Sequence, residues 1–256
     1  MDGRARETRV GALEQKFLIS SQLGARIADW ARARLPADPH GAGPFGDEYR
    51  ITSLYFDTDR HDVLHARGSF GRCKYRVRRY GVSEFVFLER KLRRPGLLHK
   101  RRSLAGIGDL GRLGEPEPGA GWPGDWFHRR LLVRRLAPRC ELSYLRMARA
   151  IEINGVLVRL TLDCQIRVRE IRHLRFGHGP DASVLDQRMV LELKCRGVLP
   201  ALFKQLLEMF ALAPTTGSKY RLGMAALGHR VPQPVPVSPP AGSAQVRVRE
   251  RREKTS

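Results

Sequence analysis

The sequence feature that most constrains the fold is an alternation of charged and apolar residues in several strand-like segments. In residues 72–78, RCKYRVR, arginines and a lysine alternate with Cys73, Tyr75 and Val77. Successive side chains of a β-strand point to opposite faces, so this segment would carry one charged and one apolar face. The same separation occurs in residues 13–19, 84–92, 157–163 and 189–195. We therefore expect a sheet whose two faces differ sharply in charge.

The charged face repeats a carboxylate that is followed two residues later by a lysine. The pairs are Glu14 and Lys16, Glu89 and Lys91, and Glu192 and Lys194. An ordinary antiparallel sheet with one solvated face would also separate polar from apolar residues, but here the polar face is almost wholly charged. If the strands form one sheet that closes, the charged face lines its interior. The predicted fold is α+β, a closed antiparallel β-barrel that forms a tunnel with a charged interior and helices packed outside.

The remaining segments indicate one domain. We expect strands at 12–20, 49–57, 72–80, 84–92, 98–104, 140–149, 155–163, 165–173 and 189–195, and helices at 21–35, 122–136, 200–211 and from Ser218 onward. No internal repeat or linker interrupts residues 10–228. Residues 1–9 are expected to be a disordered N-terminus, and residues 229–256 a disordered, proline-rich basic tail.

The net charge of +21 calls for an anionic partner, and nucleic acid, anionic lipid and phosphorylated small molecules all satisfy that requirement. A nucleic-acid surface should interleave aromatic residues with cations and exclude carboxylates. Here Glu14, Glu89, Glu192 and Asp163 lie among the basic residues, and no nucleic-acid-binding motif is visible. Many cations with a few carboxylates suit a chain of phosphates and a divalent metal, Mg²⁺ or Mn²⁺.

Cysteine usage and hydropathy bear on the compartment. Cys73, Cys140, Cys164 and Cys195 are far apart and form no metal-binding or disulfide pattern. The N-terminal residues lack the apolar core of a signal peptide, and no apolar run is long enough to span a membrane. We expect a cytoplasmic protein, with peripheral association at the inner membrane face as a further option.

Eight motifs occur in an order that resembles the VTC domain. They are ALEQKF, SLYFDT, KYRVRRYG, FLERK with Lys100 following, YLRMAR, VRLTLD, VLELK and SKYRLG, spread from about residue 10 to about residue 226. The VTC domain is the polyphosphate polymerase domain of the vacuolar transporter chaperone family, within the triphosphate tunnel metalloenzyme superfamily. The resemblance implies a closed barrel forming a tunnel. It also implies transfer of the ATP γ-phosphoryl group to a polyphosphate chain, with release of ADP.

The resemblance also implies roles for individual residues. The catalytic cations would be Lys16, Arg76, Arg78, Lys91, Arg146, Arg159 and Lys219. Phosphate binding would add Lys74, Lys100, Lys194 and Ser218, and the metal-binding carboxylate would be Glu192, with Glu14 and Glu89 as further ligands or as partners for lysines. The implied partners are ATP and inorganic polyphosphate, and a separate membrane protein is a further option.

One departure from the wider superfamily matters. Many of its members carry ExExK on the first strand, whereas the first glutamate position is Ala12 here. This disfavours a triphosphatase that uses both glutamates. Two alternatives stay open: hydrolysis of triphosphate or polyphosphate in the same tunnel, and a polyphosphate- or nucleic-acid-binding module without turnover. Asp57 is expected to cap the turn that follows it, and Asp163 is either a salt-bridge partner or part of the site.

Overall fold

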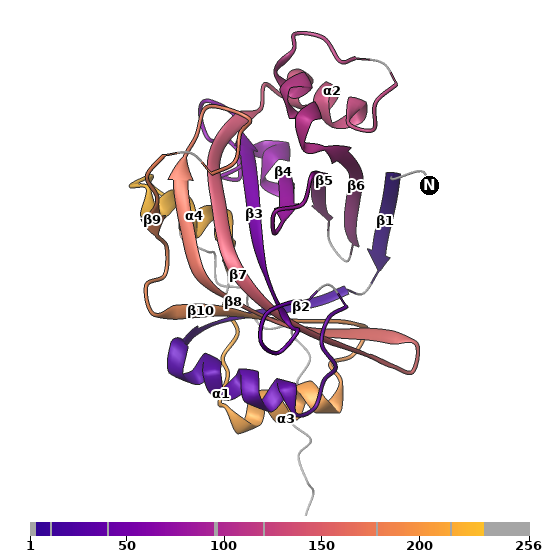
Figure 1. Ribbon diagram of the computed structural model, residues 1–256, viewed down its shortest axis with the longest axis vertical. Coiled ribbons are helices and arrows are strands. Elements are labelled where there is room, and N and C mark those ends of the chain that lie inside the picture. The colour runs from indigo at the N-terminus through magenta and orange to yellow at the C-terminus, as the bar shows by residue number, and fades with distance from the viewer. Residues whose placement is uncertain are drawn as a thin grey trace, which may run out of the picture.

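The computed structural model describes residues 4–10, 12–39, 41–94, 97–119, 121–177, 179–215 and 217–232, and it is built around one antiparallel sheet (Figure 1). The strands are β1 (Arg4–Val10), β2 (Ala12–Ser20), β3 (Glu48–Asp57), β4 (Cys73–Tyr80), β5 (Phe85–Arg94), β6 (Leu97–Gly106), β7 (Ala137–Ile153), β8 (Val156–Glu170), β9 (Ala182–Ser183) and β10 (Arg188–Arg196). Their order is β1-β6-β5-β4-β3-β7-β8-β10-β2, with β9 paired to β8.

The predicted closed barrel is not observed, because the two ends of this sheet, β1 and β2, do not pair with each other in the described residues. A closed barrel would need β2 to pair with the free edge of β6. That edge of β6 is already paired with β1, from Arg4 opposite Ser103 to Val10 opposite Leu97. The sheet is nevertheless strongly curved, since Lys91 on β5 reaches Glu14 on β2 with an Nζ–Oε2 distance of 3.0 Å. The concave face therefore encloses a charged interior without a closed backbone ladder.

Residues 1–9 were expected to be disordered, whereas in the structure residues 4–10 form strand β1. The segment RARETRV lacks the alternation that marks the other strands, so its sequence gave no strand signal. An edge strand can be held by backbone hydrogen bonds to its neighbour, a form of pairing that leaves little trace in side-chain pattern. Of the predicted tail at 229–256, residues 233–256 lie outside the described part of the chain.

Four α-helices accompany the sheet: α1 (Ser21–Arg32), α2 (Asp125–Val133), α3 (Ala201–Met209) and α4 (Lys219–Ala226). Two short 3₁₀ helices, η1 (Gly68–Arg72) and η2 (Ile107–Gly114), complete the described elements. α1 and α3 lie together beneath β2, β8 and β10, whereas α2 lies at the opposite end of the molecule (Figure 1). Ile27 and Phe203 anchor α1 and α3 in one fully buried apolar cluster.

α4 differs from the expected external helices because it packs on the concave face. Gly223 approaches Leu142 and Val168, which share that face with the charged interior residues further along β7 and β8. A Cβ at position 223 would lie 3.0 Å from the Leu142 side chain, so glycine permits this close approach. α4 thereby brings its first residue, Lys219, into the interior.

β8 is one continuous strand, where two strands at 155–163 and 165–173 were expected. Its register against β7 shifts near Gln165, whose φ of 49° is a left-handed conformation. The extra residue bends the strand without ending it, as β-bulges do. Within the described residues, no helix has the length and apolar character needed to cross a membrane.

Candidate functional site: the charged concave face

Strand register places the predicted charged residues in rows across the concave face. Glu192 of β10 lies opposite Lys16 of β2 on one side and Thr161 of β8 on the other. Lys194 lies opposite Glu14 in the next row. The side chains that alternate on each strand in the sequence are thus gathered on one surface by the antiparallel pairing.

Glu14 and Glu192 form a pair of ionised carboxylates in this surface. Glu14 contacts Lys16 Nζ at 2.9 Å and Lys91 Nζ at 3.0 Å, and Glu192 contacts Lys194 Nζ at 3.0 Å. Burial raises the pKa of Glu192, but the nearby Lys194, Lys16 and Lys219 outweigh burial and hold that pKa well below its usual range. Burial and the neighbouring Glu192 raise the pKa of Glu14, whereas Lys91 and Lys16 bring it to a net lowering. Both carboxylates are therefore charged at neutral pH.

These two carboxylates are the part of the site that fits a divalent metal. The described residues contain no group of three or more metal-ligating side chains. Mg²⁺ is often held by one or two carboxylates together with substrate phosphates, so a pair suffices when the substrate supplies the remaining oxygens. Thr161, which lies opposite Glu192, is 1% exposed, and its Oγ1 has no hydrogen-bond partner among the described residues. The Thr161 hydroxyl is therefore a further oxygen on the same face of the sheet as Glu192.

Glu89, the third predicted ligand, is surrounded by cations instead. Its Oε2 accepts a hydrogen bond from Arg76 Nε at 2.7 Å, and its Oε1 lies 3.1 Å from Lys100 Nζ and 3.5 Å from Arg102 Nε. Burial raises the pKa of Glu89, yet Arg76, Arg78, Lys100 and Arg102 hold it well below its usual range. These contacts agree with the prediction that Glu89 is a partner for cations, and its alternative role as a metal ligand stays a prediction.

Two interior cations have no carboxylate partner in the described part of the chain. Arg78 donates to Ser53 Oγ and Tyr144 OH, both at 3.3 Å, and is 7% exposed. Lys74 has no ion pair, and burial together with Lys16, Lys91, Arg221 and Arg76 holds its pKa well below its usual range. Concentrating like charges in this way is costly unless an anion neutralises them. The arrangement therefore favours an anionic ligand.

Asp163 holds two of the predicted catalytic cations. It accepts two hydrogen bonds from Arg146, at 2.6 and 2.8 Å, and its other contact is Lys219 Nζ at 2.5 Å. Asp163 is completely buried, and burial raises its pKa, but Arg146 and Lys219 bring it below its usual value. Asp163 is therefore a salt-bridge partner of two predicted site residues, and its part in the site stays a prediction.

Arg159 is fixed at the other end of the surface by residues that the sequence did not single out. Its Nη2 lies 2.8 Å from Asp38 Oδ2 and 2.6 Å from Tyr49 OH. Asp38 belongs to the loop between α1 and β3, where no periodic pattern could signal it. Arg102 was also missed, although it shares the alternation of Lys100 on β6 and could have been found by the same rule.

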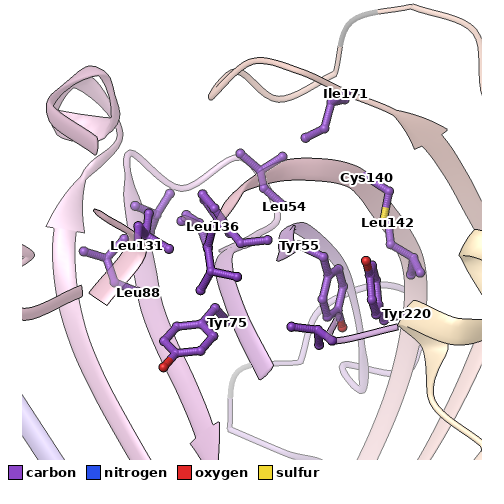
Figure 2. Close-up of a cluster of buried hydrophobic side chains, with 14 of the residues drawn as sticks. Leu54, Tyr55, Tyr75, Leu88, Leu131, Leu136, Cys140, Leu142, Ile171 and Tyr220 are labelled. Atoms are coloured by element: carbon purple, nitrogen blue, oxygen red, sulfur yellow. The ribbon is translucent and has the colours of Figure 1, made fainter. Parts of the chain in front are cut away.

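Lys219 is positioned by a buried contact of its neighbour Tyr220. The Tyr220 hydroxyl donates to Asp57 Oδ2 at 2.7 Å, and Asp57 also accepts from the backbone N–H groups of Val63 and Leu64 at 2.8 and 2.9 Å. Asp57 therefore caps the turn after β3, as expected, and tethers α4 as well. Figure 2 shows the Tyr220 ring beside that of Tyr55, with ring centroids 5.3 Å apart.

Ser218 serves this helix as its N-cap. Its Oγ accepts a hydrogen bond from the Arg221 backbone N–H at 3.3 Å. A cap of this kind satisfies one of the donors left free at a helix start. In the structure the hydroxyl predicted to bind phosphate is thus engaged with the backbone, beside Lys219.

A strongly curved antiparallel sheet with cations concentrated on its concave face defines the class of fold, which is of the tunnel type. The VTC domain matches residues 12–106 and 121–228, and the chain belongs to this family. A search of curated protein sequences finds no match.

Solved structures with similar folds have low sequence identity to the chain. A candidate adenylate cyclase from Bacillus halodurans has 15% identity and a TM-score of 0.50, over 82% of this chain and 95% of its own. The Hippeastrum protein HpAC1, described as a candidate adenylyl cyclase with a dominant triphosphatase activity, has 15% identity and a TM-score of 0.45, over 86% of this chain and 97% of its own. The first of these likenesses supports the fold alone.

Proposed function

We propose that this protein is a polyphosphate polymerase that transfers the γ-phosphoryl group of ATP to the end of an inorganic polyphosphate chain. The observation that carries the proposal is that Lys74 and Arg78 have no ion pair with a carboxylate among the described residues, within a surface already rich in ion pairs. A linear chain of phosphates would neutralise both. Membership of the VTC domain family supports the same substrate class.

In the proposed reaction, an oxygen of the terminal phosphate of the polyphosphate forms a new bond to the γ-phosphorus of ATP. The bond from that phosphorus to the β–γ bridging oxygen breaks, and ADP leaves with the bridging oxygen. Such transfers need little covalent chemistry from the protein, so positioning and charge stabilisation supply most of the catalysis. Arg78, Arg146 and Lys219 are held by Tyr144 and Asp163 in orientations that suit this task.

Glu14 and Glu192 would hold the Mn²⁺ or Mg²⁺ that the fold family implies. The metal would supply neutralisation of phosphate charge when it is bound with substrate. The chain's own contribution is to keep both carboxylates ionised, through Lys16, Lys91 and Lys194. It also keeps Lys219 and Arg146 extended toward the phosphates by anchoring them to Asp163.

Purified protein incubated with ATP and Mn²⁺ tests the proposal. ADP together with acid-insoluble phosphate chains on a gel is the expected result. Free phosphate without chains would replace the polymerase with a triphosphatase in the same site. Tight polyphosphate binding without turnover would replace it with a binding module.

Two variants separate catalysis from binding. Glu192→Gln should abolish synthesis while retaining or improving polyphosphate binding, because a negative charge is lost from an anion-binding surface. Arg78→Gln should reduce turnover by about 10²–10³, the usual cost of removing one donor that stabilises developing charge. Lys204→Gln is the matched control, since Lys204 is exposed on α3, away from the concave face. Full activity in both site variants would rule out the assignment.

A further inference from the structure

A second arginine-lined hollow lies on the opposite, convex face of the sheet. This outer pocket has a volume of about 420 Å³, and its lining residues come from β3, β4, β7 and β8, together with Gly81, Phe176, Gly177 and Asp181. Arg50 and Thr52 of β3 line it, whereas the alternate residue Ser53 contacts Arg78 in the interior. Because neighbouring residues of a strand face opposite sides, the outer pocket and the concave site are separate.

The carboxylates of the outer pocket are already paired. Asp181 accepts from Arg167 Nε at 2.8 Å and Arg169 Nη2 at 3.2 Å. Glu141 lies 3.3 Å from Arg169 Nε and accepts from the Gly177 backbone N–H at 2.7 Å. The two carboxylates of the pocket, Asp181 and Glu141, therefore bind Arg167, Arg169 and the Gly177 backbone, which also line the pocket.

Arg50 is left with unneutralised charge. Its Nη2 donates to Gln165 Oε1 at 3.3 Å, and it has no carboxylate partner in the part of the chain that the structure describes. The remaining nitrogens of its guanidinium stay available on an exposed side chain. Arg79, the other cation of the wall, instead donates to the carbonyls of Val82 and Ser83, both at 2.8 Å.

Gln165 owes its position to the bulge in β8. A non-glycine residue at φ 49° within a strand has a backbone conformation that L-amino acids disfavour. Bulges of this kind redirect a side chain. Here the amide oxygen meets Arg50, which leaves the amide nitrogen as a further donor in the pocket wall.

We propose that the outer pocket binds a small phosphate-type oxyanion, such as inorganic phosphate or pyrophosphate. Its donors come from three strands, with Arg50 and Thr52 on β3, Ser143 on β7 and Gln165 on β8. Donors that converge from separate directions match the several oxygens of a phosphate better than the two coplanar oxygens of a carboxylate, and guanidinium groups bind phosphate in a bidentate manner. The volume is within the range of ligand pockets. This site is independent of the proposed function of the concave face.

Arginine labelling with phenylglyoxal, measured by peptide mass spectrometry, tests the proposal on the full chain. Pyrophosphate at about ten times its dissociation constant should slow labelling of Arg50 by about tenfold, as mass action requires. Arg60 is the control, because its side chain is 83% exposed in the turn after β3 and should label at an unchanged rate. Unchanged labelling of Arg50 at saturating pyrophosphate would overturn the proposal.

Substitutions on the concave face distinguish protection of Arg50 by a ligand in the outer pocket from protection by an anion bound on the concave face. Protection of Arg50 should persist in the double variant Lys74→Gln and Arg78→Gln. Equilibrium dialysis of radiolabelled pyrophosphate against that double variant should show one remaining site, and a third substitution, Arg50→Gln, should remove it. Loss of Arg50 protection in the double variant would mean that the protection came from the concave face, and the outer site would be rejected.

Discussion

Two neighbouring rows of side chains cross β4, β5 and β6, and the sign of the central charge differs between them. One row reads Arg76, Glu89, Arg102, and the other reads Lys74, Lys91, Lys100. In the first row a buried carboxylate joins the cations on both sides. In the second, three ammonium groups lie directly opposite one another, which is an unfavourable arrangement in an empty sheet.

We call the row of Arg76, Glu89 and Arg102 the arginine row and the row of Lys74, Lys91 and Lys100 the lysine row. Carboxylates that lie outside the lysine row neutralise only some of its lysines. Lys91 reaches across the interior to Glu14, and Lys100 reaches Glu89 in the adjacent row. Among the described residues, Lys74 has no such partner. The contrast teaches that the arginine row supports the fold, whereas the lysine row keeps positive charge available for a ligand.

The largest expected effect is on stability, from Glu89→Gln. This variant keeps the side-chain shape but removes the charge that Arg76, Lys100 and Arg102 share at a site 2% exposed. Breaking a buried ion pair by removing one partner usually costs about 3–5 kcal/mol. Urea unfolding of the variant should show this loss. A loss below about 1 kcal/mol would mean that the arginine row is not structural.

Lys74→Gln should have the opposite outcome. Removing one of three opposed lysines relieves repulsion, so the unfolding midpoint should be equal to or above that of the wild type. Polyphosphate affinity should fall by about tenfold, which corresponds to about 1.4 kcal/mol. Titration calorimetry against Lys204→Gln measures the difference. Equal affinity in the two variants would contradict a ligand role for the lysine row.

Tyr220→Phe tests the tether that places Lys219 beside the two rows. The substitution leaves Asp57 buried without one of its donors, which should cost about 1–3 kcal/mol. Because Lys219 is the adjacent residue, turnover should fall more than ATP affinity does. Tyr49→Phe is a comparison variant, since Tyr49 OH contacts Arg159 at the far end of the surface. A purely structural tether would lower stability and leave the turnover of folded protein unchanged.

The smallest effect is a dependence on pH. Burial lowers the pKa of Lys91, Glu14 partly restores it, and Lys16 and Lys194 lower it further, so that it lies at about 8 instead of 10.5. Lys91 is therefore charged below pH 8 and loses its charge as the pH rises through that value. Polyphosphate affinity should decline over the same range, and binding at pH 8.5 should take up protons.

Calorimetry in buffers of different ionisation enthalpy measures that uptake. Tyr80, with a pKa lowered to about 8 by Arg78 against the effect of burial, also titrates on this face. Lys91→Arg stays charged throughout and should remove the part of the uptake that belongs to Lys91. Unchanged uptake in Lys91→Arg would contradict a role for Lys91 and point to Tyr80.

The sequence by itself determined which side chains share the charged face. The two-residue period of Glu14 and Lys16, of Glu89 and Lys91, and of Glu192 and Lys194 is a local property of extended backbone, so it could be read directly. The same rule separated the apolar residues that pack against α1 and α3. Family membership was also present in the order of the motifs and is confirmed.

Tertiary structure alone decided how those faces meet. Pairing of β1 with β6 left the sheet open, the pairing of β4, β5 and β6 placed Glu89 between arginines, and curvature brought Glu14 to Lys91 across the interior. Asp38 and the tether between Asp57 and Tyr220 join residues far apart in the chain. Period and composition describe neighbours along a strand. Which strands become neighbours in space decides which cations are neutralised, and why Lys74 and Arg50 have no carboxylate partner among the described residues.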